Sequence, residues 1–270
     1  MKTIIIFLSS ILLNISHTLA YEHELSICAI FQNEAPYLKE WLDYHLHVGV
    51  DHFWLYNNDS QDDFRPILQP YIDSGIVDLI EWPGEFRQAD CYNDGVKHAK
   101  GKTNWIAFID LDEYIVPKFY GDIKKVLKRF YKAKKAIYVH WLQFGTGGVN
   151  LGPGPILPYL TKCSNVNNGW NRIGKPLLRL EVLDTIKDIH YPTLKAPYRY
   201  YDGSGNLGEY GLHAEKYLRI NHYTFRDEWY FWNVKVPRII NWGGQIEDLL
   251  IKNPQFSECE DRFILQLLPK

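Results

Sequence analysis

The sequence of 270 residues predicts an α/β fold in which a mostly parallel sheet is flanked by helices. Apolar runs of strand length alternate with helix-spaced segments between residues 25 and 139, an order typical of parallel sheets. Polar residues directly follow several of these strands, where ligands of such sheets bind. Glycine and proline are frequent from Gly145 to Gly154, and the pattern beyond them is irregular. Because no internal repeat or linker is present, residues 21–270 are predicted to form a single domain.

Continuous apolar runs predict the strands, since a strand buried on both faces shows no polar alternation. These runs lie at residues 25–31, 52–56, 77–80, 105–109 and 136–139. The first helix opens at Pro36, whose fixed φ suits a first turn, and ends at Gly49. Apolar residues at helical spacing predict three more helices, at residues 67–72, 92–99 and 123–130. Short strands are expected at 177–182 and 217–220, and a last helix at 227–234.

Composition limits the partners of the chain. The net charge of −2 gives no reason to expect nucleic acid or an anionic membrane surface as a partner. The 9 tryptophans and 19 tyrosines suit sugar rings as well as protein cores. The 4 cysteines contain no C-x-x-C pair, so structural zinc is not expected, whereas one or two disulfides are allowed on an export route.

The N-terminal segment has the pattern of a secretory signal. Lys2 precedes an apolar stretch from Ile4 to Leu13, and small residues at Thr18 and Ala20 suit a signal peptidase. We therefore expect residues 1–20 to be a signal peptide and the protein to be exported or to enter the secretory pathway. An uncleaved segment would instead anchor the protein to a membrane, the one membrane association expected.

Two carboxylates follow the apolar run at residues 105–109. In extended backbone, residues i and i+2 point the same way, so Asp110 and Asp112 share a face while Leu111 turns inward. Paired carboxylate oxygens suit a hard divalent cation such as Mg²⁺ or Mn²⁺, which in turn can hold a diphosphate. This pattern indicates an enzyme that uses a nucleotide-diphosphate donor. The alternative is an acidic surface turn.

Several blocks together resemble glycosyltransferase family 92, a branch of the inverting GT-A sugar transferases. These blocks are I-F-Q-N-E-A-P-Y-L-K-E-W-L-D-Y-H at 30–45, Y-N-N-D-S at 56–60, W-I-A-F-I-D-L-D-E-Y at 105–114, W-L-Q-F-G at 141–145 and I-N-H-Y at 220–223. The resemblance covers roughly residues 25–240 and implies a GT-A type, Rossmann-like fold. In this fold the irregular C-terminal half would bind the acceptor.

The resemblance also implies roles for individual residues. The implied metal ligands, for Mn²⁺ or Mg²⁺, are Asp110, Asp112 and His222. The implied donor-binding residues are Asn33, Glu34, Asp59, Gln88, Asn93 and Asp110. A structural role remains open for His222, and helix or turn capping for Asn33 and Asn93.

The function that follows is a metal-dependent, inverting transfer of a sugar, with galactose as one candidate, from a UDP-sugar to a glycan or glycoprotein acceptor. Such a hexosyltransferase needs a general base, and we expect Asp227 or Glu228, with Glu209 and Glu215 as further candidates. Asp227 and Glu228 could instead complement a helix N-terminus. A catalytically inactive carbohydrate-binding protein of the same fold is the main alternative function, and a glycoside hydrolase is another.

Overall fold

The computed structural model describes residues 21–208 and 213–269, so the expected signal segment 1–20 lies outside the described residues. The strands are β1 (His23–Phe31), β2 (His52–Asn57), β3 (Val77–Glu81), β4 (Thr103–Phe108), β5 (Glu113–Pro117), β6 (Ala136–Gln143), β7 (Lys162–Cys163), β8 (Gly174–Leu178), β9 (Leu183–Thr185), β10 (Thr193–Leu194), β11 (Tyr201–Asp202), β12 (Leu218–His222) and β13 (Cys259–Glu260). The α-helices are α1 (Ala35–His47), α2 (Arg65–Asp73), α3 (Gln88–Ala99), α4 (Ile123–Phe130), α5 (Glu228–Tyr230), α6 (Val236–Asn241) and α7 (Ile246–Gln255). A π-helical turn, Phe231–Lys235, joins α5 to α6.

The central sheet has a parallel half and a mixed half. Its strands lie in the order β3-β2-β1-β4-β8-β6-β12-β5, and β11 pairs with β6. Strands β1 to β4 pair in parallel, as the alternating pattern predicts. Strand β8 then runs antiparallel between β4 and β6, and β5 runs antiparallel to β12. The α/β class of the predicted fold is confirmed, and the antiparallel strands are a feature that the pattern did not reveal.

Apolar side chains cover both faces of the sheet. In β1, Leu25, Ile27 and Ala29 belong to one buried cluster, together with Leu38 of α1 and Val126 of α4. Cys28 points to the opposite face and packs in a second cluster with Tyr92 of α3. The alternation of a strand's side chains therefore divides the core into two layers. No helix in the described part of the chain is both long and apolar enough to span a bilayer.

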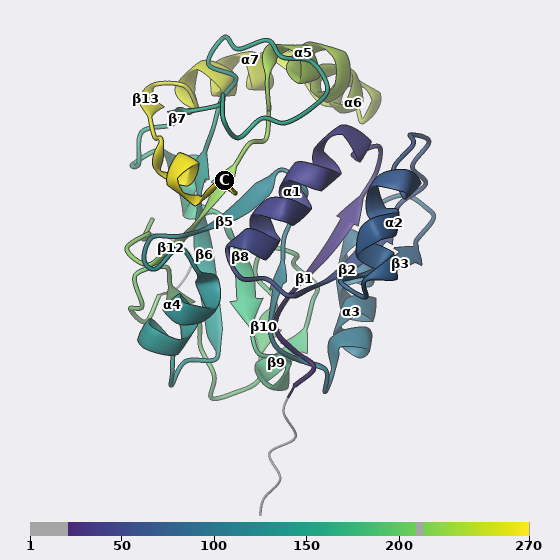
Figure 1. Ribbon diagram of the computed structural model, residues 1–270. Coiled ribbons are helices and arrows are strands. Elements are labelled where there is room, and N and C mark those ends of the chain that lie inside the picture. The colour runs from purple at the N-terminus through teal and green to yellow at the C-terminus, as the bar shows by residue number, and fades with distance from the viewer. Residues whose placement is uncertain (1–20, 209–212, 270) are drawn as a thin grey trace, which may run out of the picture.

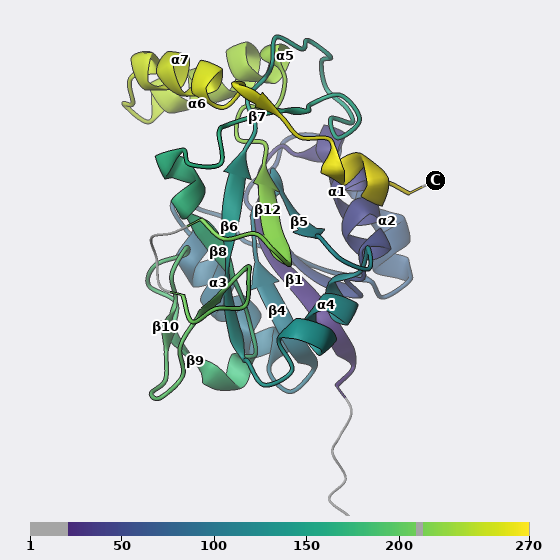
Figure 2. The same cartoon turned by 90° about the vertical axis from the view of Figure 1, so that its left-hand side faces the viewer.

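A smaller group of helices and strands lies outside the central sheet and its two core layers. Helices α5, α6 and α7 lie with β7 and β13 at the top of Figure 1, and Figure 2 shows the same group from the side. Phe225, Phe231, Leu249 and Phe256 form its own apolar cluster. We call residues 225–261 the C-terminal lobe. It lies on the side toward which β1 points (Figure 1), where the parallel strands end.

His45 joins α1 to the sheet as a neutral side chain. Its Nδ1 lies 2.9 Å from the carbonyl oxygen of Trp41, and its Nε2 accepts the backbone N–H of Ile115 at 3.3 Å. An acceptor role at Nε2 requires the neutral ring, with the proton on Nδ1. Burial lowers the pKa of His45 to about 3. The folded protein therefore does not protonate this ring in mildly acidic solution.

This burial predicts a loss of stability in acid. Below the usual histidine pKa of about 6.5 the unfolded chain binds a proton that folded His45 does not, which costs about 1.4 kcal/mol per pH unit down to the folded pKa. His45→Gln keeps a donor and an acceptor but does not titrate. As the pH falls from 7 to 4, the free energy of unfolding measured with urea should decrease less for the variant than for the wild type. A stability difference that stays constant with pH would contradict this assignment.

Candidate active site

A pocket lies where the parallel strands end. Phe31 of β1 pairs with Asn57 of β2, and Cys28 pairs with Phe108 of β4, so the segments after these strands converge. The pocket has a volume of about 330 Å³. Its lining residues are Ile30, Phe31, Gln32, Glu34, Asn58, Phe86, Arg87, Gln88, Asp110, Leu111, Asp112, Tyr230, Arg238 and Trp242. The structure thus brings together four of the expected site residues, namely Glu34, Gln88, Asp110 and Asp112.

Asp110 lies against a buried lysine. Its Oδ2 accepts the Lys175 ammonium at 2.9 Å, while its Oδ1 accepts the Gln88 amide and the Tyr92 hydroxyl. Lys175 is fully buried, and its Nζ also lies 3.9 Å from Glu113 Oε1. Burial lowers the pKa of Lys175, but the carboxylates of Asp110 and Glu113 outweigh burial and hold it above its usual value. Both oxygens of Asp110 therefore already have partners.

Asp112 lies beside His222. The His222 Nε2 is 3.6 Å from the Asp112 Oδ2, because β12 pairs with β5 so that His222 lies opposite Glu113. Burial raises the pKa of the Asp112 carboxyl, but the charges of His222 and Lys235 outweigh burial and hold this pKa below its usual range. The Nδ1 atom of His222 has no hydrogen-bond partner in the described part of the chain.

The side chains of Asp112 and His222 could together bind a divalent cation, whereas Asp110 is not placed as a third ligand. A distance of 3.6 Å exceeds a hydrogen bond, yet metal–ligand bonds of about 2.0–2.2 Å could reach both atoms from one ion. Within residues 21–208 and 213–269, no group of three His, Cys, Asp or Glu side chains is placed to hold a metal. In the structure, Asp112 is therefore paired with His222, and Asp110 is paired with Lys175.

The C-terminal lobe supplies positive charge that the motifs did not reveal. Arg226 is buried between the rings of Tyr37 and Tyr230 and forms an ion pair with Glu34. Burial raises the pKa of Glu34, and the positive charge of Arg226 offsets only part of this increase. Lys235 lies close enough to Asp112 for each charge to shift the pKa of the other, and Arg238 lines the pocket. The only sequence signal for these cations is their place shortly after His222.

Three expected donor-binding residues lie outside the pocket lining. Asn33 and Asp59 have left-handed φ values of 56° and 54° and hold the loops at its rim. Asn33 Oδ1 accepts the Gln61 N–H at 2.7 Å, and Asp59 Oδ2 accepts the Gly84 N–H at 2.9 Å. Asn93 donates to the carbonyl oxygens of Ala89 and Ile186, both at 2.8 Å. In this structure Asn33 and Asp59 shape loops, whereas Asn93 lies inside α3 and joins this helix to the segment at Ile186.

The two expected general bases are also bound elsewhere. Asp227 is fully buried and accepts the backbone N–H groups of Leu151, Gly152 and Tyr230, so it caps α5. These hydrogen bonds to backbone groups favour the helix-capping role that the sequence left open for Asp227. Glu228 accepts from Thr146 and, at 3.1 Å, from Trp232, outside the pocket lining. Among the further candidates, Glu215 is paired with Arg219 and Glu209 lies outside the described residues.

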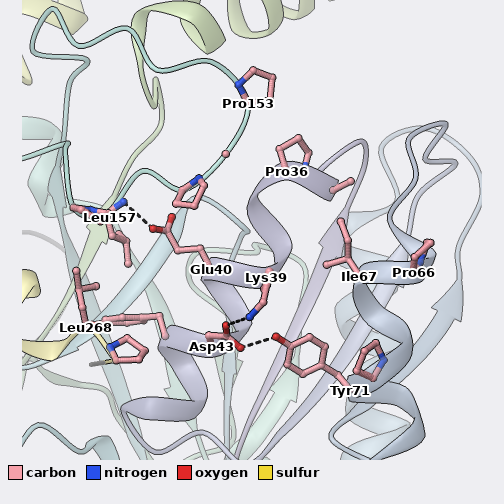
Figure 3. Close-up of a pocket in the computed structure, with 17 residues that line it drawn as sticks. Pro36, Lys39, Glu40, Asp43, Pro66, Ile67, Tyr71, Pro153, Leu157 and Leu268 are labelled. Atoms are coloured by element: carbon pink, nitrogen blue, oxygen red, sulfur yellow. Dashed lines mark hydrogen bonds and ion pairs between the residues drawn. The ribbon is translucent and has the colours of Figure 1, made fainter.

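A larger cavity of about 850 Å³ lies between α1, α2 and the loop at residues 153–158. Figure 3 shows the prolines that surround it, among them Pro36, Pro66 and Pro153. Its acidic side chains are already bound: Glu40 accepts the Ile156 and Leu157 N–H groups, and Asp43 pairs with Lys39 and Tyr71. The smaller pocket beside Asp112 is therefore better suited to a charged ligand.

Residues 21–198 match the sequence model of glycosyltransferase family 92. The chain belongs to this family. A family 92 protein of Arabidopsis thaliana is 24% identical over 218 residues, which are 76% of this chain and 36% of that protein. One from Ricinus communis is 33% identical over 93 residues, or 34% of this chain and 17% of that protein. The chain thus spans at most about a third of the length of these curated relatives, 36% in the longer match.

Solved structures resemble this family 92 chain only distantly. The crystal structure of Staphylococcus aureus TarS residues 1–349 has a TM-score of 0.39 and 16% identity, covering 59% of this chain and 48% of that one. Glucosyl-3-phosphoglycerate synthase from Mycobacterium tuberculosis, solved with Mn²⁺ and UDP, has a TM-score of 0.33 and 15% identity, covering 60% and 58%. Likeness at this level assigns no ligand to the family 92 pocket.

The burial of Lys175 predicts a large effect on stability. Lys175→Met leaves the carboxylates of Asp110 and Glu113 without their internal cation, which should lower the free energy of unfolding by about 3–5 kcal/mol. Lys39→Met is the matched control, because its ion pair with Asp43 is exposed and should contribute less than about 1 kcal/mol. Urea denaturation of both variants measures the difference. Equal, small losses would show that Lys175 is not the counter-ion of this cluster.

Proposed function

We propose that this chain is a glycosyltransferase that binds a UDP-sugar in the pocket at the ends of β1 and β4. Membership of family 92 supports the reaction class, and the pocket supports the place. The observation that carries the proposal is that Asp110 and Asp112 line this pocket together with Arg238 of the C-terminal lobe. Acidic side chains beside cationic ones suit a ligand that carries both a ribose and a diphosphate.

The donor diphosphate would lie beside Asp112, with Mn²⁺ or Mg²⁺ held by Asp112 and His222. A divalent cation bound there stabilises the charge that develops on the departing diphosphate. The positive charges of Lys235 and Arg238 would also stabilise the departing diphosphate. Asp110, fixed by Lys175 and Gln88, would accept a hydroxyl hydrogen from ribose or sugar. Of the two expected general bases, only Glu228 stays in the proposal, because Asp227 is bound to backbone groups.

The finer features of the proposal come from the family resemblance. They are inversion at the sugar carbon, galactose as the first sugar to test, and a glycan or glycoprotein as acceptor. Residues 1–20 support a location in the secretory pathway or outside the cell, with membrane attachment only if that segment is retained. A carbohydrate-binding protein without activity would bind glycan and show no affinity for UDP.

Metal dependence can be tested by binding. Calorimetric titration of UDP should show affinity higher by about tenfold or more when Mn²⁺ is present. Asp112→Asn and His222→Ala should each remove this increase, because each removes one proposed ligand of the ion. Asp43→Asn, in the other cavity, is the control and should leave it unchanged. UDP affinity that does not respond to Mn²⁺ in the wild type would exclude the metal, and absence of UDP binding would exclude the donor site.

The cations of the C-terminal lobe can be tested separately. Lys235→Ala and Arg238→Ala should each weaken UDP binding by about tenfold to a hundredfold, since each removes a charge-assisted contact with phosphate. Uridine carries no phosphate, so its affinity should change less than UDP affinity. Equal losses for UDP and uridine would place these side chains at the base or ribose instead.

A further inference from the structure

Two cysteines lie directly opposite each other where the C-terminal lobe meets the sheet. Strand β7 pairs antiparallel with β13, and Cys163 is the partner of Cys259. Residues opposite one another in an antiparallel pair have Cα atoms about 4.5–5.5 Å apart, which lies within the range of about 4.4–6.8 Å found in disulfides. Their side chains leave the same face of the pair. Cys163 is buried, whereas Cys259 is partly exposed.

The segment that carries Cys259 supports the loop between β6 and β7. Gly145 N–H donates to the Phe256 carbonyl at 2.7 Å, and Thr146 N–H donates to Asn253 Oδ1 at 2.9 Å. A Cβ atom on Gly145 would lie 2.1 Å from Ser257 Oγ, so the two segments are in close contact. Asp261 accepts Arg219 of β12 at 2.6 Å. This segment therefore connects the C-terminal lobe, with Arg238 and Trp242, to the sheet.

We propose that Cys163 and Cys259 form a disulfide that fastens the C-terminal lobe to β7, which is bridged to Phe144 at the end of β6. The oxidant is a small or protein disulfide, of which oxidised glutathione is the simplest. The Cys259 thiolate attacks it and releases one thiol, and the Cys163 thiolate then attacks the mixed disulfide and releases the second. One S–S bond forms in the protein as the oxidant's S–S bond breaks, and the two protons pass to the released thiolates. The partly exposed Cys259 is the first to react.

The other two cysteines provide an internal comparison. Cys28 and Cys91 also lie in contact, since a hydrogen bond between them is one cause that raises the pKa of Cys91, after burial. Both side chains are fully buried in the cluster beneath α3. A dissolved oxidant reaches neither of them in the folded protein. The two pairs should therefore differ in reactivity toward a dissolved oxidant, although the two cysteines of each pair are neighbours.

The experiment treats the folded full chain with oxidised glutathione, blocks free thiols after denaturation, and maps tryptic peptides without reduction. We expect one cross-linked species that joins residues 163–172 to residues 253–262, lighter by two hydrogen atoms than the sum of its peptides. The peptides with Cys28 and Cys91 should be recovered fully blocked. The oxidised protein should also unfold at a higher urea concentration than the reduced protein, because the cross-link restricts the unfolded chain.

Variants separate the alternatives. Cys91→Ala should retain the cross-link, and Cys259→Ser should remove it and leave Cys163 free. Recovery of both Cys163 and Cys259 as blocked free thiols after oxidation of the wild type would overturn the proposal. A link between Cys28 and Cys91 without the proposed one would do the same. Because the readout is a peptide mass, the result does not depend on the glycosyltransferase proposal.

Discussion

Two carboxylates leave the sheet beside each other, and the structure depends on how their charge is balanced. Asp110 and Asp112 follow β4 into a partly buried pocket, where unpaired negative charge is costly. Asp110 receives the ammonium of Lys175 from within the core. Asp112 instead faces His222, with Lys235 and Arg226 near enough to lower its pKa. The same short motif thus contains one carboxylate with an internal cation and one suited to an external cation.

The mixed half of the sheet brings the side chains that meet this requirement. Lys175 reaches Asp110 because β8 runs antiparallel between β4 and β6. The approach of β8 to β6 needs Gly174, since a Cβ atom there would lie 2.1 Å from the carbonyl oxygen of Val139. His222 reaches Asp112 because β12 pairs with β5, directly after the acidic motif. If β6 lay directly beside β4, no strand pairing would bring Lys175 to Asp110.

The parallel half and the pocket's acidic residues could be predicted because their signals are local. An apolar run, a helical spacing or a D-x-D pair is contained within a few residues. Lys175 carries no such signal, since its partner Asp110 is 65 residues away and its strand is short. For Asp227 the sequence left two roles open, because an acid at a helix start suits both capping and catalysis, and its three backbone partners favour capping. Strand β5 was missed because no glycine or proline marks the turn between Asp110 and Glu113.

One buried charge helps to hold the C-terminal lobe in position. Arg226 has a left-handed φ of 48°, a conformation that costs about 1–3 kcal/mol and persists only where surrounding contacts compensate for it. The Glu34 carboxylate and the rings of Tyr37 and Tyr230 supply those contacts. Glu34 and Tyr37 lie at the start of α1, so the same contacts attach the lobe to the sheet's helical layer. Movement of the lobe away from α1 would leave Glu34 buried without its partner, so this ion pair helps to keep Lys235 near Asp112.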